Sequence, residues 1–228
     1  MNRWLLPQGI EDVLPERAEA IEGLRRRVLD LYHRWGYELI MPPEVEFLDS
    51  LLTGVGGDLS LRTMKVVDQP SGHLMGFRAD MTPQVARVDA NRLEGDGPRR
   101  LCYAGTVLRA QPDIYGRSRA PLQVGAEVFG VSGPSADGEV IGLMAATLSE
   151  VGIREFTLDL GHVGLYRALV EDLDADADRE ARIRDAVRRK DREAVTAALE
   201  GTGASSDLCG ALEALTALHG GPEVLEKA

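Results

Sequence analysis

Residues 122–130 read LQVGAEVFG, and their alternation decides how the rest of the sequence is interpreted. Successive side chains of a β-strand point to opposite faces of a sheet, so two faces can be assigned. One face carries the apolar side chains of Leu122, Val124, Ala126 and Val128. The other carries Gln123, Gly125, Glu127 and Phe129. The segment therefore predicts a strand with one apolar and one largely polar face.

The polar face of this strand is a candidate ligand site. Gln123 and Glu127 lie four residues apart and point the same way, and Gly125 between them is expected to leave that face unobstructed. An ionised Glu only accepts hydrogen bonds, whereas Gln offers both a donor and an acceptor. These groups suit a small polar ligand with an ammonium group. The plainer alternative, the solvated face of a half-exposed sheet, fits the pattern at least as well and stays open.

A second candidate cluster lies in residues 78–82, RADMT, at a predicted strand-to-helix junction. Asp80 can accept a hydrogen bond from a ligand amine, or it can brace the turn. Thr82 can bind a ligand or act as the N-cap of the helix, with Pro83 in the first turn, and both residues favour those positions. The sequence leaves both alternatives open for both residues.

The remaining polar residues give weaker signals. Arg109 ends a predicted strand and offers a planar donor fork for phosphate or carboxylate, although a surface ion pair is equally compatible. Arg117 and Arg119 follow on a polar loop and are expected to be solvated. No metal site is expected, because no H-E-x-x-H motif occurs and the four histidines are scattered at His33, His73, His162 and His219. Neither a Walker loop nor a G-x-S-x-G elbow occurs.

The wider pattern predicts an α+β fold, an antiparallel sheet flanked by helices. Helices are predicted at 16–35, 82–93 and 136–151. Strands are predicted at 37–41, 63–67, 74–78, 100–104, 106–109 and 156–160, with a hairpin joining the second and third of these. Beyond about residue 170 the sequence is charged, rich in Ala and without a strand signal, and a last helix is expected at 205–219. We therefore expect one domain at 1–170 and a small helical insertion at 171–228.

Composition narrows the functional classes. The 228 residues carry a net charge of −11, which weighs against nucleic-acid binding because phosphate backbones attract Lys and Arg. No apolar run approaches the roughly 18 residues of a membrane-spanning helix, and the N-terminus does not resemble a secretory signal. Cys102 and Cys209 are the two cysteines, and such distant thiols fit a reducing cytoplasm better than a disulfide framework.

Several segments together point to one family. They are PQG at 7–9 with DVLP at 12–15, the helix and strand leading to Pro43, RADMT at 78–82 with Arg87, VLRAQ at 107–111, GRSR at 116–119 and QVGAEVFG at 123–130. In order and spacing they resemble the catalytic domain of class II histidyl-tRNA synthetases over about residues 5–170. The segment from helix to Pro43 resembles motif 1, which builds the dimer interface in that family. Residues 107–111 resemble motif 2.

The departures from the synthetase pattern are informative. Arg109 matches the motif 2 Arg that holds the ATP α-phosphate, but Gln111 stands where the family has Glu. Residues 79–81, ADM, replace P-E-G, and Pro121 replaces a Phe. This version, R-A-D-x-T-P-Q-x-A-R, resembles the regulatory subunits of ATP phosphoribosyltransferase, a branch that does not charge tRNA.

The resemblance implies a regulatory, non-catalytic role in the first step of histidine biosynthesis, with no cofactor and no bound tRNA. The α-ammonium of histidine, the feedback effector, would meet the matching residues Asp80, Thr82, Gln123 and Glu127. The implied partner is a short-form catalytic subunit, which the chain would activate within a cytoplasmic hetero-octamer, with self-association through the motif 1-like region.

Two other readings remain. The first is a divergent or truncated histidyl-tRNA synthetase, which Arg109 favours and Gln111 opposes. The second is a scaffold that binds no ligand. The family's R-G-x-x-Y-Y motif and motif 3 would follow the helical insertion, so we expect the histidine site of these 228 residues to be incomplete.

Overall fold

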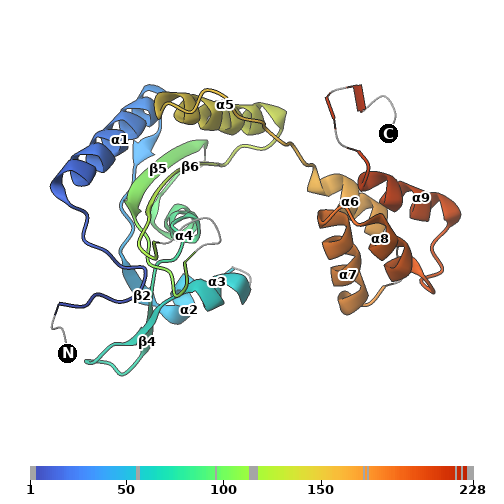
Figure 1. Cartoon of the computed structure of the whole chain (residues 1–228), viewed down its shortest axis with the longest axis horizontal. Helices are drawn as coiled ribbons and strands as arrows, with labels where there is room; N and C mark the ends of the chain where they lie inside the picture. Colours follow the sequence, from blue (N-terminus) through green and yellow to red (C-terminus); the bar gives the residue numbers. More distant parts are fainter. Residues whose placement is uncertain are drawn as a thin grey trace. The chain divides into compact units, whose positions relative to one another are not determined.

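The computed structural model describes residues 4–54, 57–95, 97–112, 118–171, 173, 175–218, 220–221 and 223–224. The chain divides into two compact units, Met1–Phe156 and Thr157–Ala228 (Figure 1). The first unit holds two small sheets with helices, and the second is helical. The predicted division into a domain at 1–170 and a helical insertion at 171–228 stays a prediction.

The central sheet of the first unit has the strand order β1-β5-β6. β5 (Arg99–Thr106) and β6 (Leu122–Phe129) pair antiparallel along their whole length, from Arg99↔Phe129 to Thr106↔Leu122. The two-residue β1 (Glu38–Leu39) runs parallel to β5. The predicted class of helices flanking a largely antiparallel sheet is therefore confirmed, with one parallel pair added.

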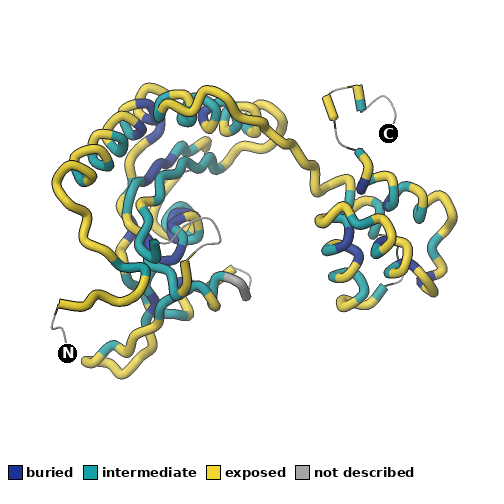
Figure 2. The backbone as a smooth tube through the Cα atoms, in the orientation of Figure 1, coloured by how far each residue is buried: buried dark blue, intermediate teal, exposed yellow. Residues whose placement is uncertain are grey.

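Two helices cover the apolar face of this sheet. They are α1 (Pro15–Arg34) and α5 (Pro134–Glu150). Their buried residues form a core with Tyr37 and Cys102, against which Val124, Ala126 and Val128 pack. Figure 2 shows buried stretches on both the helices and the strands of this unit. The predicted apolar face of β6 is confirmed at these three positions.

A three-residue brace ties α5 to the sheet. Glu139 of α5 accepts two hydrogen bonds from Arg100, Nε to Oε1 at 2.6 Å and Nη2 to Oε2 at 2.7 Å. Tyr37 donates its hydroxyl to the same Oε1 at 3.0 Å. Such a bidentate pair fixes orientation as well as distance.

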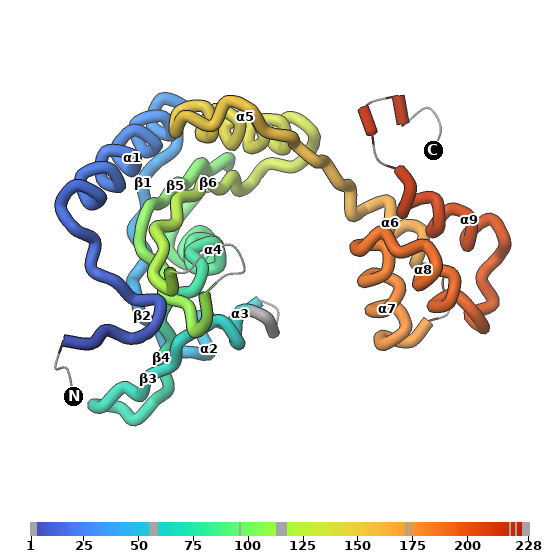
Figure 3. The backbone as a smooth tube through the Cα atoms, in the orientation of Figure 1, coloured from blue at the N-terminus to red at the C-terminus, as the bar shows by residue number. Residues whose placement is uncertain are grey.

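The opposite face of the sheet receives α4 (Thr82–Arg92), which lies on the other side of β5 and β6 from α1 and α5 (Figure 3). Met81 and Val85 pack there against Leu101, Tyr103 and Val107. A second sheet, of order β2-β4-β3, is antiparallel throughout. Its strands are β2 (Val45–Phe47), β4 (Leu74–Phe77) and β3 (Lys65–Val67), accompanied by α2 (Leu48–Leu51) and α3 (Gly57–Arg62). The predicted hairpin is the β3–β4 pair.

In the described part of the second unit, four helices pack around a buried cluster of Ile183, Ala186, Val195, Leu199 and Leu212. The helices are α6 (Val163–Val170), α7 (Ala177–Arg188), α8 (Arg192–Leu199) and α9 (Ser206–Leu215). Each of the last three begins with a side-chain cap, from Asp176, Asp191 and Ser205 respectively. These caps satisfy backbone N–H groups that a helix start leaves unpaired.

Two strand predictions were wrong, and one of the two alternatives for Thr82 is excluded. The strands expected at 100–104 and 106–109 are one strand, β5, that ends at Thr106. Residues 156–160 form no strand, because alternation makes a strand only where a neighbour completes the ladder, and the structure gives this segment no pairing partner among the described residues. Thr82 is the first residue of α4 and not its N-cap, which is Met81 without a side-chain cap bond.

Candidate functional site

Three of the four predicted histidine ligands meet at the start of α4. Gln123 Nε2 donates to Asp80 Oδ1 at 2.9 Å, and the Thr82 backbone N–H donates to the same oxygen at 3.0 Å. The other end of the Gln123 amide, Oε1, accepts the Met81 N–H at 2.9 Å. Because donor and acceptor are both engaged, the orientation of this amide is defined. Strand β6 and the turn before α4 are thus joined through a single side chain.

Tyr103 connects the fourth predicted ligand, Glu127, to the others. Its hydroxyl lies 2.9 Å from Thr82 Oγ1 and donates to Glu127 Oε1 at 3.2 Å. The two bonds link β5, β6 and α4 into one continuous network. Sequence reasoning missed Tyr103, because its place depends on the pairing Tyr103↔Gly125 across the β5–β6 ladder. A local pattern within one strand does not contain that register.

The sequence suggested that Gly125 leaves the sheet face open, but the structure shows that this face is covered. A Cβ built on Gly125 would lie 2.3 Å from Cζ and the hydroxyl oxygen of Tyr103. The Tyr103 ring therefore occupies the space above Gly125, and it is only 2% exposed. The absence of a side chain at 125 serves to admit this ring. Asp80, Gln123 and Glu127 remain partly exposed and Thr82 exposed, so the network borders solvent.

The protonation states of Asp80 and Tyr103 are set by their surroundings. Burial alone would raise the pKa of Asp80, but hydrogen bonds from Gln123 and Thr82, together with the charge of Arg62, lower it below its usual value. Asp80 is therefore a carboxylate at neutral pH. Burial raises the pKa of Tyr103, and the negative charge of Glu127 adds to this effect against an opposing bond from Thr82. The phenol thus keeps its proton and can donate it.

Two arginines lie beside Asp80. Arg109 Nε lies 3.5 Å from the Ala79 carbonyl oxygen. Burial lowers the pKa of Arg109, the neighbouring charge of Arg62 lowers it further, and Asp80 opposes both. Arg62 and Arg109 are brought together by the backbone, since Ala110 N–H donates to the Arg62 carbonyl at 2.8 Å. Arg62 could not be predicted from the sequence, because it belongs to no recognisable motif.

Arg119 was expected to be solvated, but its guanidinium makes hydrogen bonds within the protein. It donates to the Arg109 carbonyl at 2.9 Å and to the Gln8 carbonyl at 3.3 Å. These bonds tie the N-terminal segment to the loop after β5, a long-range contact that local sequence cannot reveal. Arg117 and His219, also named in the sequence analysis, lie outside the described residues.

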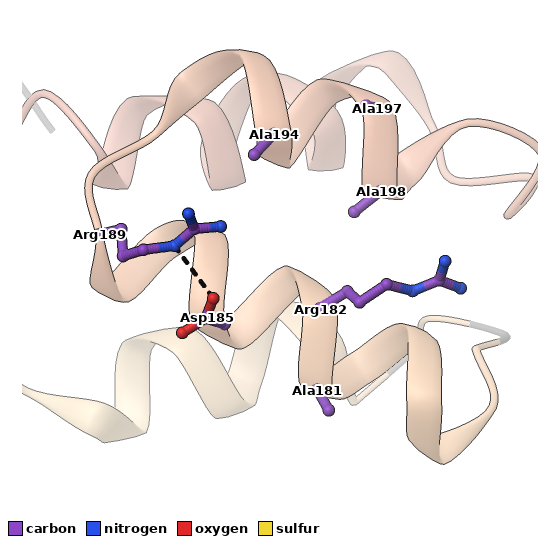
Figure 4. A pocket seen from close by; sticks show the side chains of 7 residues that line it. All are labelled: Ala181, Arg182, Asp185, Arg189, Ala194, Ala197 and Ala198. Atoms are coloured by element: carbon purple, nitrogen blue, oxygen red, sulfur yellow. Dashed lines mark ion pairs between the residues drawn. The ribbon is translucent and has the colours of Figure 1, made fainter.

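No predicted site residue lines the surface groove that the second unit carries. This groove has a volume of about 450 Å³ and lies between α7 and α8 (Figure 4). It is lined by Ala181, Arg182, Asp185, Arg189, Ala194, Ala197 and Ala198. Its Asp185 pairs with both Arg188 and Arg189, and Arg182 adds a further positive charge to the lining.

Two further observations concern the described residues. No group of three His, Cys, Asp or Glu side chains there is arranged to hold a metal ion. In the same part of the chain, no helix combines the length and the apolar character needed to cross a lipid bilayer.

The sheet, its helices and the network at the start of α4 define a domain of the class II aminoacyl-tRNA synthetase type. A sequence model of the family described as histidyl-tRNA synthetase matches residues 9–228, and the chain belongs to this family. Curated relatives named ATP phosphoribosyltransferase regulatory subunit include proteins from Thioalkalivibrio sulfidiphilus and Pseudomonas fluorescens, each 53% identical over 100% of the chain. The chain spans 58% and 57% of the lengths of these two relatives.

Solved structures agree with this assignment. A Bacillus halodurans protein described as an ATP phosphoribosyltransferase regulatory subunit/histidyl-tRNA synthetase superimposes with a TM-score of 0.83 at 30% identity, over 100% of this chain and 59% of that one. A histidine–tRNA ligase subunit from Alicyclobacillus acidocaldarius gives 0.69 at 21% identity, over 100% of this chain and 72% of that one. The second comparison supports the fold alone.

Proposed function

We propose that the chain is part of a regulatory subunit of ATP phosphoribosyltransferase, and that Asp80, Thr82, Gln123 and Glu127 bind free histidine. The observation that carries the proposal is the continuous hydrogen-bond network among these four residues, in which the Thr82 backbone N–H bonds to Asp80 and Tyr103 bridges Thr82 and Glu127. The choice of ATP phosphoribosyltransferase as the regulated enzyme rests on the names of relatives that are 53% identical.

The network matches the chemistry of an α-ammonium group. An ammonium has three donors and no acceptor, and the site offers acceptor oxygens on Asp80, Thr82 and Glu127. Gln123 orients Asp80, because its amide donates to the Asp80 carboxylate and accepts from the Met81 N–H. Hydrogen bonds between ionised groups are shorter and stronger than neutral ones. A ligand that brings its own positive charge would therefore gain more here than a neutral polar molecule.

The residues that differ from the synthetase pattern argue for sensing over catalysis. Gln111 lacks the negative charge of the motif 2 Glu, and Asp80 is one methylene shorter than the Glu of P-E-G. The proposed subunit activates a short-form catalytic subunit in a cytoplasmic hetero-octamer and associates with itself through the motif 1-like region. Feedback then requires that histidine binds one assembly state better than another, because equal affinity for both states shifts nothing.

Co-expression with a short-form ATP phosphoribosyltransferase tests this proposal. The 228-residue chain and a version extended to the length of its relatives should be compared in parallel. The expected result is a co-purifying complex whose phosphoribosyl transfer is inhibited by histidine. An extended protein that neither assembles with the catalytic subunit nor makes it sensitive to histidine would exclude the regulatory role.

A second candidate function is histidyl-adenylate formation, and Arg109 is the residue that favours it. Arg109 matches in sequence the motif 2 Arg that holds the ATP α-phosphate in the synthetases. Histidine-dependent exchange between ATP and pyrophosphate measures this reaction directly. We expect no exchange from the extended protein, and exchange above background would favour the synthetase reading. A protein that binds no histidine by calorimetry and shows no exchange would be a scaffold.

A further inference from the structure

Helix α4, whose first turn carries the candidate ligands, is anchored by a carboxylate from a different element. Glu46 lies in β2, and its side chain is only 8% exposed. Its Oε1 accepts a hydrogen bond from Gln84 Nε2 at 2.8 Å and another from Arg87 Nη2 at 2.5 Å. Both donors lie on α4, within five residues of Thr82.

The orientation of Gln84 makes this anchor specific. Gln84 is 1% exposed, and its Nε2 also donates to the Pro43 carbonyl at 2.8 Å. A flipped amide would turn its oxygen toward a carboxylate and a carbonyl, which both lack protons, so the orientation is settled by chemistry. The Gln84 amide therefore donates to two acceptors of the segment 43–46, the Pro43 carbonyl and the Glu46 carboxylate.

The same segment holds the other end of the ligand turn. Arg78, which precedes Asp80 by two residues, is 6% exposed. Its backbone N–H donates to the Glu44 carbonyl at 3.0 Å, and its Nη1 donates to the Pro42 carbonyl at 2.7 Å. Residues 42–46 thus contact the chain on both sides of the Asp80–Thr82 turn. The position of the turn depends on this segment as well as on Gln123.

The anchor leaves two buried polar atoms unsatisfied. Within the described part of the chain, Gln84 Oε1 and Arg87 Nε are buried and have no hydrogen-bond partner. An unpaired buried polar atom costs free energy. Gln84 and Arg87 both direct donors at Glu46 and leave other polar atoms unpaired.

We infer that Glu46 is a positioning residue for the ligand site, which acts through Gln84 and Arg87 to hold the Asp80–Thr82 turn where it can receive an ammonium group. The inference rests on the proposed function, because it assigns a role in the same site. Glu46 touches no proposed ligand atom, so its effect must pass through the turn. A change at Glu46 should then alter recognition of the ammonium and leave contacts to the rest of the ligand intact.

The test uses calorimetry with two probes on the extended protein, L-histidine and imidazolepropionate, which lacks the α-ammonium. Glu46→Gln removes the charge and keeps the shape. We expect its affinity for histidine to fall on the order of tenfold, within the range seen for residues that act through others. Its affinity for imidazolepropionate should stay that of the wild type. On an Asp80→Asn background, Glu46→Gln should add little further loss, since residues in one network are not additive.

Matched variants separate the possible outcomes. Glu22→Gln breaks an exposed pair with Arg26 on α1 and should leave both affinities unchanged. Should Glu46→Gln not fold, Arg87→Lys gives the same comparison with the charge retained and the planar fork lost. Equal weakening toward both probes would mean a merely structural role and would overturn the inference, as would unchanged histidine affinity. A wild-type protein that binds no histidine would overturn the proposed function itself.

Discussion

Replacing Gly125 by Ala tests the packing on which the candidate site depends. The added Cβ would lie 2.3 Å from the Tyr103 Cζ and hydroxyl oxygen, and 2.7 Å from Cε2. Carbon atoms in ordinary contact lie about 3.5–4.0 Å apart, so the ring must move by roughly 1 Å or more. Tyr103 is 2% exposed and packs beside Met81 and Leu101, so it has little room to do so.

The expected cost follows from this overpacking. Inserting a methyl group into a well-packed core costs about 1–3 kcal/mol. We expect Gly125→Ala to lower the free energy of unfolding by an amount in this range, measured by urea denaturation. The shifted ring would also lose its bonds to Thr82 and Glu127, so histidine affinity should fall in parallel.

Two further variants make the test decisive. Gly138→Ala lies in α5, where an added Cβ has no neighbour within 4 Å, and should stabilise the protein by up to about 1 kcal/mol through helix propensity. Tyr103→Leu removes the ring, so Gly125→Ala should cost less on that background than in the wild type. A Gly125→Ala protein as stable as the wild type would refute the close contact between position 125 and Tyr103.

Three further predictions concern the site, the brace and the buried thiol. Glu127→Ala should weaken histidine binding on the order of 2–3 kcal/mol in calorimetry, the cost of a lost charge-assisted hydrogen bond, and an unchanged affinity would remove Glu127 from the site. The Arg100 and Tyr37 donors hold the pKa of Glu139 below its usual value, with Arg100 the larger cause, so the brace stabilises the fold at neutral pH and the contribution is lost as pH falls through the lowered pKa. The stability gap between wild type and Glu139→Gln should therefore be constant near neutral pH and shrink in acid, and a gap independent of pH would contradict the ion pair. Burial raises the pKa of Cys102 to about 11, so this thiol should resist alkylation at pH 8 in the native protein and react after unfolding, which mass spectrometry of the modified peptide can follow.

The sequence predicted the two faces of β6 because alternation with a period of two is a property of the strand itself. Val124, Ala126 and Val128 pack on the helices, and Gln123 and Glu127 share the other face. The fold class followed from such patterns together with the family motifs. Asp80 and Thr82 were candidates because of their place at a predicted strand-to-helix junction, whereas the family resemblance alone implied histidine as their ligand, and this binding role stays a prediction.

What the sequence did not reveal depends on contacts between distant segments. Tyr103 reaches the site through cross-strand pairing, and Arg62 through the backbone beside Arg109. The sequence allowed Thr82 to cap α4 or to bind a ligand, but it did not reveal that the Thr82 hydroxyl bonds to Tyr103, a residue 21 positions away. Residues 156–160 alternate like a strand, yet the structure pairs them with no described neighbour. Propensity describes what a segment can form, and tertiary partners decide what it does form.

The uninterrupted eight-residue pairing of β5 with β6 limits how this protein can vary over evolution. A single-residue insertion inside either strand would turn the side chains beyond it to the wrong face, moving Val124 or Val128 toward α4 and Glu127 toward the helix-packed core. An insertion of two residues would restore the faces but displace Tyr103 from Gly125. Length changes among homologues should therefore be found in the connection between the strands, residues 107–121, and be absent from the strands themselves.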